Sequence, residues 1–242
     1  VTATCYDLGV KQGKTNIVVK DGPGFYTTRI LSPFFNEALL MMGEGIDALQ
    51  LDNVIKKFGY PVGPVTLLDE VGIDVGAHVM TGDLVKFYQQ REGSVSSGDA
   101  MVQMFKAGFC GRKNKKGFYL YDEKGKKIHN KINPEAYKFF GGESRKQFDK
   151  DEIINRCALS MVNEAAYCLQ EGIIANPLDG DVGAIFGIGF PPFRGGPFRY
   201  TDAVGVDTII NLLEALASKY TARFKPAQIL VDYAKEDKKF YF

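Results

Sequence analysis

The chain has 242 residues, of which 45% are hydrophobic and 24% are charged, and its formal net charge is +1. This composition is typical of a globular protein with room for one large domain or two smaller ones. A net charge so close to zero gives no general attraction to nucleic acid or to an anionic membrane. We therefore predict no nucleic-acid partner, while a local peripheral contact with a membrane stays open.

Cysteine and histidine usage argues against a disulfide framework and a metal centre. The four cysteines show neither CxxC nor zinc spacing, which predicts buried free thiols in a reducing compartment. The two histidines, His78 and His129, are too few for a histidine-rich metal site. We predict no bound metal and a structural or solvated role for both histidines.

The first elements expected along the chain are a helix, a strand and a long helix. Residues 1–13 fit the end of a helix, and the β-branched run 15–20 predicts a buried strand. Glycines and a proline at 21–24 predict a turn. Apolar residues at helical spacing then predict a long helix from Tyr26 to about Gly43.

Shorter elements follow. A helix is expected over 53–58, capped by Asp52 and ended by Gly59. Another short helix opens at Ser97 or Asp99 and ends at Gly108, and the aromatic run 117–122 predicts a strand.

The charged stretch 123–150 predicts a solvated, partly mobile linker. Beyond it, helical spacing returns over 154–170 and 206–217. Pro226 fits the first residue of a last helix.

An internal repeat is the clearest pattern that needs no outside knowledge. At an offset of 127 the matched pairs are Arg29–Arg156, Asn36–Asn163, Glu37–Glu164, Ala38–Ala165, Glu44–Glu171, Gly45–Gly172 and Ile46–Ile173. At an offset of 133 they are Pro64–Pro197, Asp69–Asp202, Val71–Val204, Gly72–Gly205 and Asp74–Asp207. Ordered identities of this kind predict two copies of one helical unit that bury equivalent apolar faces against each other.

Several motifs resemble 3-hydroxyacyl-CoA dehydrogenases. The segment 20–29 (KDGPGFYTTR) is similar to the hinge between the NAD domain and the C-terminal domain of that family. Segments 58–64 (FGYPVGP), 68–74 (LDEVGID) and 111–119 fit the same family in the right order. The second copy carries 186–197 (FGIGFPPFRGGP), which resembles the multifunctional enzymes of fatty-acid β-oxidation, with mitochondrial trifunctional α-subunits among them.

This resemblance implies a mostly α fold. It consists of two tandem copies of a helical C-terminal unit packed with pseudo-two-fold symmetry, preceded by the last helix and strand of a truncated Rossmann domain. The implied boundaries are 1–21 for the remnant of the NAD-binding domain, 22–122 for the first helical domain, 123–150 for the linker and 151–242 for the second repeat.

The family oxidises 3-hydroxyacyl-CoA with NAD, using a His–Glu pair and a GxGxxG turn that belong to its NAD domain. Neither stands in this sequence. Residues 187–192 (GIGFPP) start like such a turn but lack the third glycine, and two prolines would break the required helix. The resemblance thus implies NAD for the full-length enzyme, while no cofactor is expected to bind this chain alone.

The resemblance also implies a few site residues. Thr28 stands where the family has an asparagine that orients the reacting groups, and the segment Pro61, Val62, Gly63 and Pro64 matches a loop that lines the acyl end of the cleft. A two-carboxylate site at Glu37 and Glu164 competes with a structural role, such as binding an arginine, and the repeat favours the structural role. Arg194 is the cation of the second Gly/Pro loop, where a surface role is favoured over anion binding, and Asn155 is interpreted as structural.

The function predicted is the substrate-cleft and assembly part of a long-chain 3-hydroxyacyl-CoA dehydrogenase, inactive as an isolated chain. A non-catalytic scaffold or subunit-interaction module is the alternative. Expected partners are a long-chain acyl-CoA bound with the help of the missing domain and other domains or subunits of a β-oxidation complex, in an oligomer. The resemblance and the lack of a Ser-Lys-Leu end imply the mitochondrial matrix.

Overall fold

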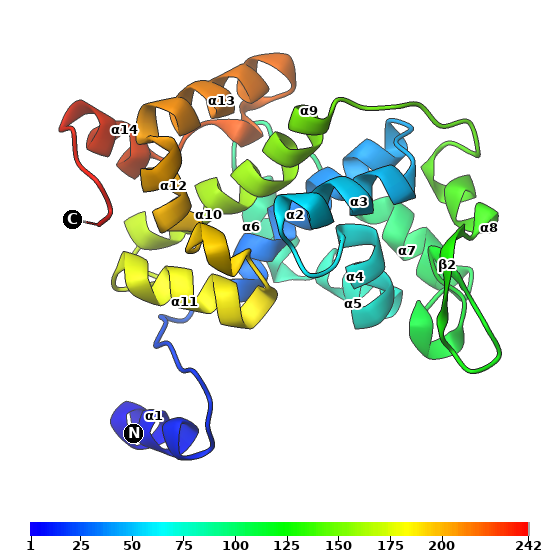
Figure 1. Ribbon diagram of the computed structural model, residues 1–242, viewed down its shortest axis with the longest axis horizontal. Helices are drawn as coiled ribbons and strands as arrows, with labels where there is room; N and C mark the ends of the chain where they lie inside the picture. Colours follow the sequence, from blue (N-terminus) through cyan, green and yellow to red (C-terminus); the bar gives the residue numbers. More distant parts are fainter. Residues whose placement is uncertain (242) are drawn as a thin grey trace. The chain divides into compact units, whose positions relative to one another are not determined.

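The computed structural model describes residues 1–241 and is mostly helical, as Figure 1 shows. Its contacts divide the chain into two compact units. The first unit is Val1–Pro33 together with Ala158–Phe242, and the second unit is Phe34–Cys157. Phe242, the last residue of the predicted second repeat, lies outside the described residues. The boundaries of the two units differ from the predicted domain boundaries. The first helix of each predicted copy contributes residues to both units.

The first unit is built from helices alone. Its elements are α1 (Thr2–Lys11), the beginning of α2 (Thr27–Gly43), α10 (Ser160–Gln170), α11 (Pro177–Ile188), α12 (Pro197–Val204), α13 (Val206–Lys219) and α14 (Gln228–Lys235). The side chain of Asn176 caps α11, and Gly189 ends it in the left-handed conformation that favours glycine.

The second unit combines short helices with one hairpin. Its elements are the rest of α2, α3 (Ala48–Phe58), α4 (Pro64–Val71), α5 (Ile73–Val79), α6 (Asp83–Gln89), α7 (Gly98–Lys106), β1 (Tyr119–Tyr121), β2 (Lys127–Ile132), α8 (Pro134–Tyr137) and α9 (Lys150–Ile154). Strands β1 and β2 pair antiparallel, with Tyr119 opposite Ile132 and Tyr121 opposite Lys127. A π-helical turn, Asn155–Leu159, joins α9 to α10.

The predicted long helix and its buried stripe are confirmed. Helix α2 begins at Thr27 and ends at Gly43, and Ile30, Phe34 and Met41 are all buried. The predicted cap of the next helix is wrong. Asp47 caps α3 by accepting hydrogen bonds from the backbone N–H groups of residues 49 and 50, so α3 begins five residues earlier than expected.

The predicted buried strand at 15–20 is also wrong. This segment is extended and half-buried to exposed, and its single bridge joins Val19 to Ile174. A β-branched run forms a strand only beside a partner strand. Within residues 1–241 no strand pairs with it beyond that bridge. Helix α1 likewise has no buried residue, and Figure 1 shows it apart from the other helices of the first unit.

Segment 123–150 carries more structure than the predicted linker. It contains β2 and α8, and Tyr137 and Phe140 are buried. Arg145 donates hydrogen bonds to the backbone carbonyls of Met42 and Phe140, which fastens the segment to the end of α2.

Two smaller predictions need correction. The last helix begins at Gln228, two residues after Pro226, a normal uncertainty for a helix boundary. The four cysteines are free, but only Cys157 and Cys168 are buried, whereas Cys5 is exposed on the uncovered helix α1. Among the described residues no helix is both long and apolar enough to span a bilayer.

Candidate functional site

Two buried arginines hold matching ion-pair clusters, one in each unit. In the first unit, Arg29 lies on α2 and its Nε donates to Glu164 of α10 at 2.7 Å, while its Nη1 lies 2.8 Å from Glu171. In the second unit, the Nε of Arg156 donates to Glu37 at 2.9 Å, and its two Nη atoms donate to Glu44 at 2.6 and 2.8 Å. Both arginines are 1% exposed or less.

These clusters decide between the two interpretations of Glu37 and Glu164. Burial alone lowers the pKa of Arg29, but its hydrogen bonds with Glu171 and Glu164 raise that pKa above its ordinary value. A buried guanidinium that stays charged needs carboxylates that stay ionised beside it. The structural role as arginine partners is therefore confirmed for both glutamates.

A second matched feature is a buried aspartate that caps a helix distant in sequence. Asp52 of α3 accepts hydrogen bonds from the backbone N–H groups of Val65 and Thr66 at the start of α4. Asp181 of α11 accepts them from Phe198 and the next residue at the start of α12. Each aspartate satisfies donors that a helix start leaves unpaired.

The same two aspartates bind a tyrosine hydroxyl. Tyr119 donates to Asp52 at 2.7 Å, and Tyr241 donates to Asp181 at 2.7 Å. A further aspartate in each unit holds the backbone of that tyrosine. Asp69 accepts from the backbone N–H of Tyr119 at 2.9 Å, and Asp202 accepts from the backbone N–H of Tyr241 at 2.8 Å.

Burial dominates the protonation of three of these carboxyl groups, those of Asp52, Asp69 and Asp181. It raises the pKa of Asp69 to about 6 and that of Asp181 to about 6, although hydrogen bonds oppose the rise. Burial also raises the pKa of Asp52. These groups sit inside packed helices and contact donors of the chain itself, so they position the Gly/Pro loops rather than face a substrate.

Only some of these aspartates and tyrosines stand out in the sequence pattern. Asp69 and Asp202 were part of the repeat, but Asp52 and Asp181 stand at an offset of 129 and the tyrosines at 122, because insertions differ between the copies. Asp52 and Asp181 could have been recognised as aspartates at buried positions of a helix. A buried carboxylate needs several hydrogen-bond donors around it, which indicates a structural role.

The structure places Thr28 in the first turn of α2, where its side chain is exposed. Its backbone carbonyl accepts a hydrogen bond from Ser32 at 2.9 Å. The neighbouring Thr27 lines a cavity, whereas Thr28 does not. Nothing in this geometry assigns a catalytic role to Thr28, which stays a prediction.

The predicted acyl-binding loop lies in the second unit. Pro61 is exposed and Val62 half-buried, while Gly63 and Pro64 are buried. A Cβ atom on Gly63 would overlap Asp52, so glycine is required where the loop crosses α3. Only Pro61 and Val62 therefore offer surface to a ligand. Thr28 and this loop belong to different units and remain two separate predictions.

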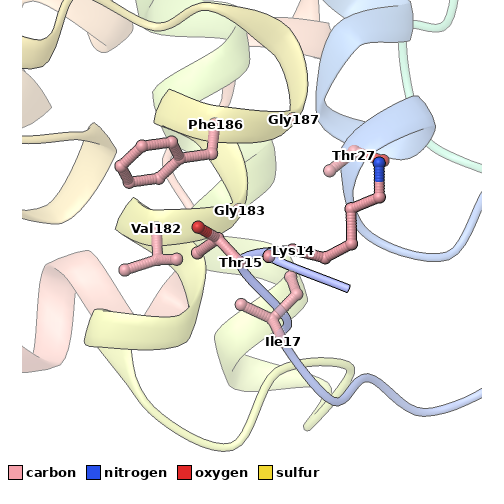
Figure 2. A pocket seen from close by; sticks show the side chains of 9 residues that line it. Lys14, Thr15, Ile17, Thr27, Val182, Gly183, Phe186 and Gly187 are labelled. Atoms are coloured by element: carbon pink, nitrogen blue, oxygen red, sulfur yellow. The ribbon is translucent and has the colours of Figure 1, made fainter. Parts of the chain in front are cut away.

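One cavity of about 410 Å³ lies in the first unit, as Figure 2 shows. The segment before α2 and the start of α2 form one side, and α11 forms the other. The lining residues are Gly13, Lys14, Thr15, Ile17, Thr27, Val182, Gly183, Phe186 and Gly187. Sequence reasoning missed this cavity because it brings together segments about 170 residues apart.

The remaining predicted residues are two histidines and the segment 187–192. His78 and His129 are both exposed. Within residues 1–241 no group of His, Cys, Asp and Glu is arranged to hold a metal ion. Gly187 lies inside α11 and Gly189 ends it, so residues 187–192 do not form the strand-to-helix turn that cradles a dinucleotide. The residues present thus do not fit NAD at this segment.

The structure also shows the surroundings of Arg194 and Asn155 in the second copy. Arg194 is half-buried, with its guanidinium 5.2 Å from the ring centre of Phe193 and 5.6 Å from that of Tyr200. Asn155 is half-buried at the start of the π-helical turn. Neither position carries a recognisable ligand site.

The matched clusters agree with comparisons against known proteins. The family described as "3-hydroxyacyl-CoA dehydrogenase, C-terminal domain" matches residues 24–121 and 153–239. The chain belongs to this family. Each matched stretch contains one buried arginine, Arg29 or Arg156, and one helix-capping aspartate, Asp52 or Asp181. The family's pattern therefore occurs twice along the sequence.

Curated relatives extend the match over nearly the whole chain. It is 50% identical over 242 residues to a fatty acid oxidation complex subunit alpha of Idiomarina loihiensis, covering 99% of this chain and 33% of that protein. It is 49% identical to a protein of the same description from Shewanella amazonensis, again covering 33% of that protein. The chain thus spans about a third of the length of these relatives.

Solved structures agree at the level of the fold. A 3-hydroxybutyryl-CoA dehydrogenase from Escherichia coli matches with a TM-score of 0.75 at 20% identity, over 95% of this chain and 63% of that one. The dehydrogenase part of a multifunctional enzyme from C. elegans matches with a TM-score of 0.67 at 27% identity, over 96% of this chain and 52% of that one. The two curated relatives are bacterial, so they do not support the expected mitochondrial matrix or the trifunctional α-subunit.

Proposed function

We propose that this chain is the C-terminal helical region of an NAD-dependent 3-hydroxyacyl-CoA dehydrogenase that acts in fatty-acid oxidation. The observation that carries the proposal is the family match over two separate stretches, 24–121 and 153–239, within one chain. The relatives described as fatty acid oxidation complex α-subunits support the pathway.

The region consists of two tandem copies of one helical unit related by pseudo-two-fold symmetry. Reciprocal ion pairs support this arrangement, since the arginine of each copy binds the glutamates of the other. The equivalent aspartate anchors at Asp52 and Asp181 support it as well. The segment 1–21 belongs to a nucleotide-binding domain, in line with the uncovered helix α1 and the unpaired run 15–20.

In this proposal Thr28 orients the reacting groups. As a separate assignment, Pro61 and Val62 contact the acyl chain, with Gly63 and Pro64 fixing their loop. The chain also supplies contact surface for other domains or subunits in an oligomer. NAD and the proton-accepting groups lie in another domain, so the isolated chain does not oxidise substrate. A long-chain 3-hydroxyacyl-CoA is the proposed substrate.

A chimera tests this function. The third of the Idiomarina loihiensis subunit that matches this chain is replaced by this chain, and NADH formation from long-chain and short-chain 3-hydroxyacyl-CoA is followed by absorbance. We expect activity from the chimera, with a preference for the long chain, and none from the isolated chain. A soluble chimera that assembles normally but forms no NADH would favour the non-catalytic scaffold, and activity of the isolated chain would refute its inactivity.

The same chimera tests Thr28. Replacing Thr28 by valine removes the hydroxyl while keeping the branched shape, and is expected to lower kcat by roughly tenfold to a hundredfold with little change in KM, because a polar orienting contact acts mainly in the transition state. Replacement by asparagine should retain activity. The neighbouring Ser32→Ala variant is the control. Equal kcat for Thr28→Val and Ser32→Ala would assign Thr28 to the helix alone.

A further inference from the structure

Helix α11 has an apolar side that is not buried by the rest of its unit. Leu178 is 59% exposed and Phe186 is 70% exposed, and Val182 between them is half-buried. Residues four apart lie on one side of a helix, so these three side chains form a continuous strip. An exposed apolar strip of this kind often marks a binding surface.

The first copy offers an internal comparison. Helix α3 is the counterpart of α11, because Asp52 and Asp181 occupy the same place and make the same bonds to the following helix. At this offset of 129, Val182 and Phe186 correspond to the exposed residues Asn53 and Lys57. The fold therefore does not require apolar residues here, and the second copy carries them for another reason.

Part of this strip faces the cavity of about 410 Å³. Figure 2 shows Val182 and Phe186 on the α11 side, with Ile17 beneath them. Gly183 and Gly187 allow α11 to approach its neighbours, since a Cβ on Gly183 would lie 2.6 Å from Ile17 and one on Gly187 would lie 2.9 Å from Thr27. The volume is in the range of about 300–1,000 Å³ usual for small-molecule sites.

The other end of the cavity is polar and positive. In Figure 2 the Lys14 side chain extends toward Thr27, which begins the 17-residue helix α2. The first turn of α2 contains no acidic residue, so its positive end is not neutralised locally. Among the described residues that line the cavity there is no carboxylate. An ammonium group, two threonine hydroxyls and a helix start together suit an anion.

We propose that this cavity binds an amphipathic anion, an alkyl chain ending in a carboxylate or a phosphate. The chain lies on Ile17, Val182 and Phe186, and the anionic group lies beside Lys14 and Thr27. The proposed site includes no residue of the predicted Pro61–Pro64 loop. It requires neither NAD nor the dehydrogenase reaction, so its test is independent of the proposed function.

Isothermal titration of the 242-residue chain tests the site, with decanoate and decyl phosphate as the two probes below their micelle concentrations. We expect saturable binding of one molecule per chain by at least one probe. Methyl decanoate, which lacks the charge, should bind about tenfold more weakly or worse, the loss expected for one charge-assisted contact. Binding of decanoate alone assigns a carboxylate ligand, and binding of decyl phosphate alone assigns a phosphate ligand.

Matched variants locate the binding. Lys14→Gln should lower the affinity for the anion by about tenfold. Phe186→Ser should lower this affinity by a similar factor through lost apolar contact. Lys57→Gln changes a charge at the counterpart position in α3 and should leave the affinity unchanged. Circular dichroism establishes that each variant is folded. Absence of saturable binding, or equal affinity in Lys14→Gln, Phe186→Ser and the unmodified chain, would overturn the proposal.

Discussion

Replacing Arg156 by methionine is expected to lower the free energy of unfolding by about 3–5 kcal/mol, the usual cost of removing one partner of a buried ion pair. The guanidinium is fully buried and donates hydrogen bonds to Glu37 and Glu44. Without it, Glu37 remains buried and loses its ion pair with Arg156, whereas Glu44 is partly exposed to solvent. Urea unfolding followed by circular dichroism measures the loss.

The double variant Arg156→Met with Glu37→Leu should recover much of that loss, because the buried charge is removed together with its partner. Arg112→Met is the matched control. Arg112 pairs with Glu70 on the surface, with both side chains partly exposed, so its replacement should cost about 1 kcal/mol or less. If Arg156→Met costs no more than Arg112→Met, the cluster does not stabilise the second unit.

Asp181→Asn is expected to change the pH dependence of stability. Burial raises the pKa of Asp181 to about 6, against about 3.9 for an aspartate in an unfolded chain. The folded chain therefore holds this proton more tightly than the unfolded chain. The stability that comes from protonation is fully present below about pH 4 and is lost as the pH rises through about 6.

Between pH 4 and pH 7 the unmodified chain should lose about 2 kcal/mol relative to Asp181→Asn. Each unit of pKa difference corresponds to about 1.4 kcal/mol, and the unfolded aspartate is only about half protonated at pH 4. The measurement is the free energy of unfolding of both chains across this range. Asp83→Asn provides a control of opposite sign, because Lys86 lowers the pKa of the exposed Asp83. If the difference in the free energy of unfolding between the unmodified chain and Asp181→Asn stays constant with pH, the assigned pKa of Asp181 is contradicted.

The sequence predicted the interactions that the repeat exposes and missed those that depend on packing. The repeat favoured a structural role for Glu37 and Glu164, such as binding an arginine, but it did not identify which arginine each glutamate binds. Asp52 was assigned to the start of its own helix on local preference. Its actual donors begin at Val65, 13 residues away, and no local rule points to them.

The strand predicted at residues 15–20 shows that a local pattern is also insufficient for strands. Its residue types favour a strand, but strand formation depends on neighbours that a local pattern does not contain. The cavity beside it was also beyond prediction, since Lys14 and Phe186 meet only through the fold. Local chemistry thus identified several of the helices, such as Thr27–Gly43, while partners distant in sequence required coordinates.

The reciprocal ion pairs also bear on how the chain is synthesised. Arg29 pairs with Glu164, 135 residues further along the chain, so it leaves the ribosome long before its counter-ion exists. A nascent chain ending before residue 164 has no carboxylate from α10 to accompany this guanidinium into the interior. Burial of the first unit therefore waits until residues 164–171 have been synthesised, which favours late, non-local folding and slow acquisition of the native state.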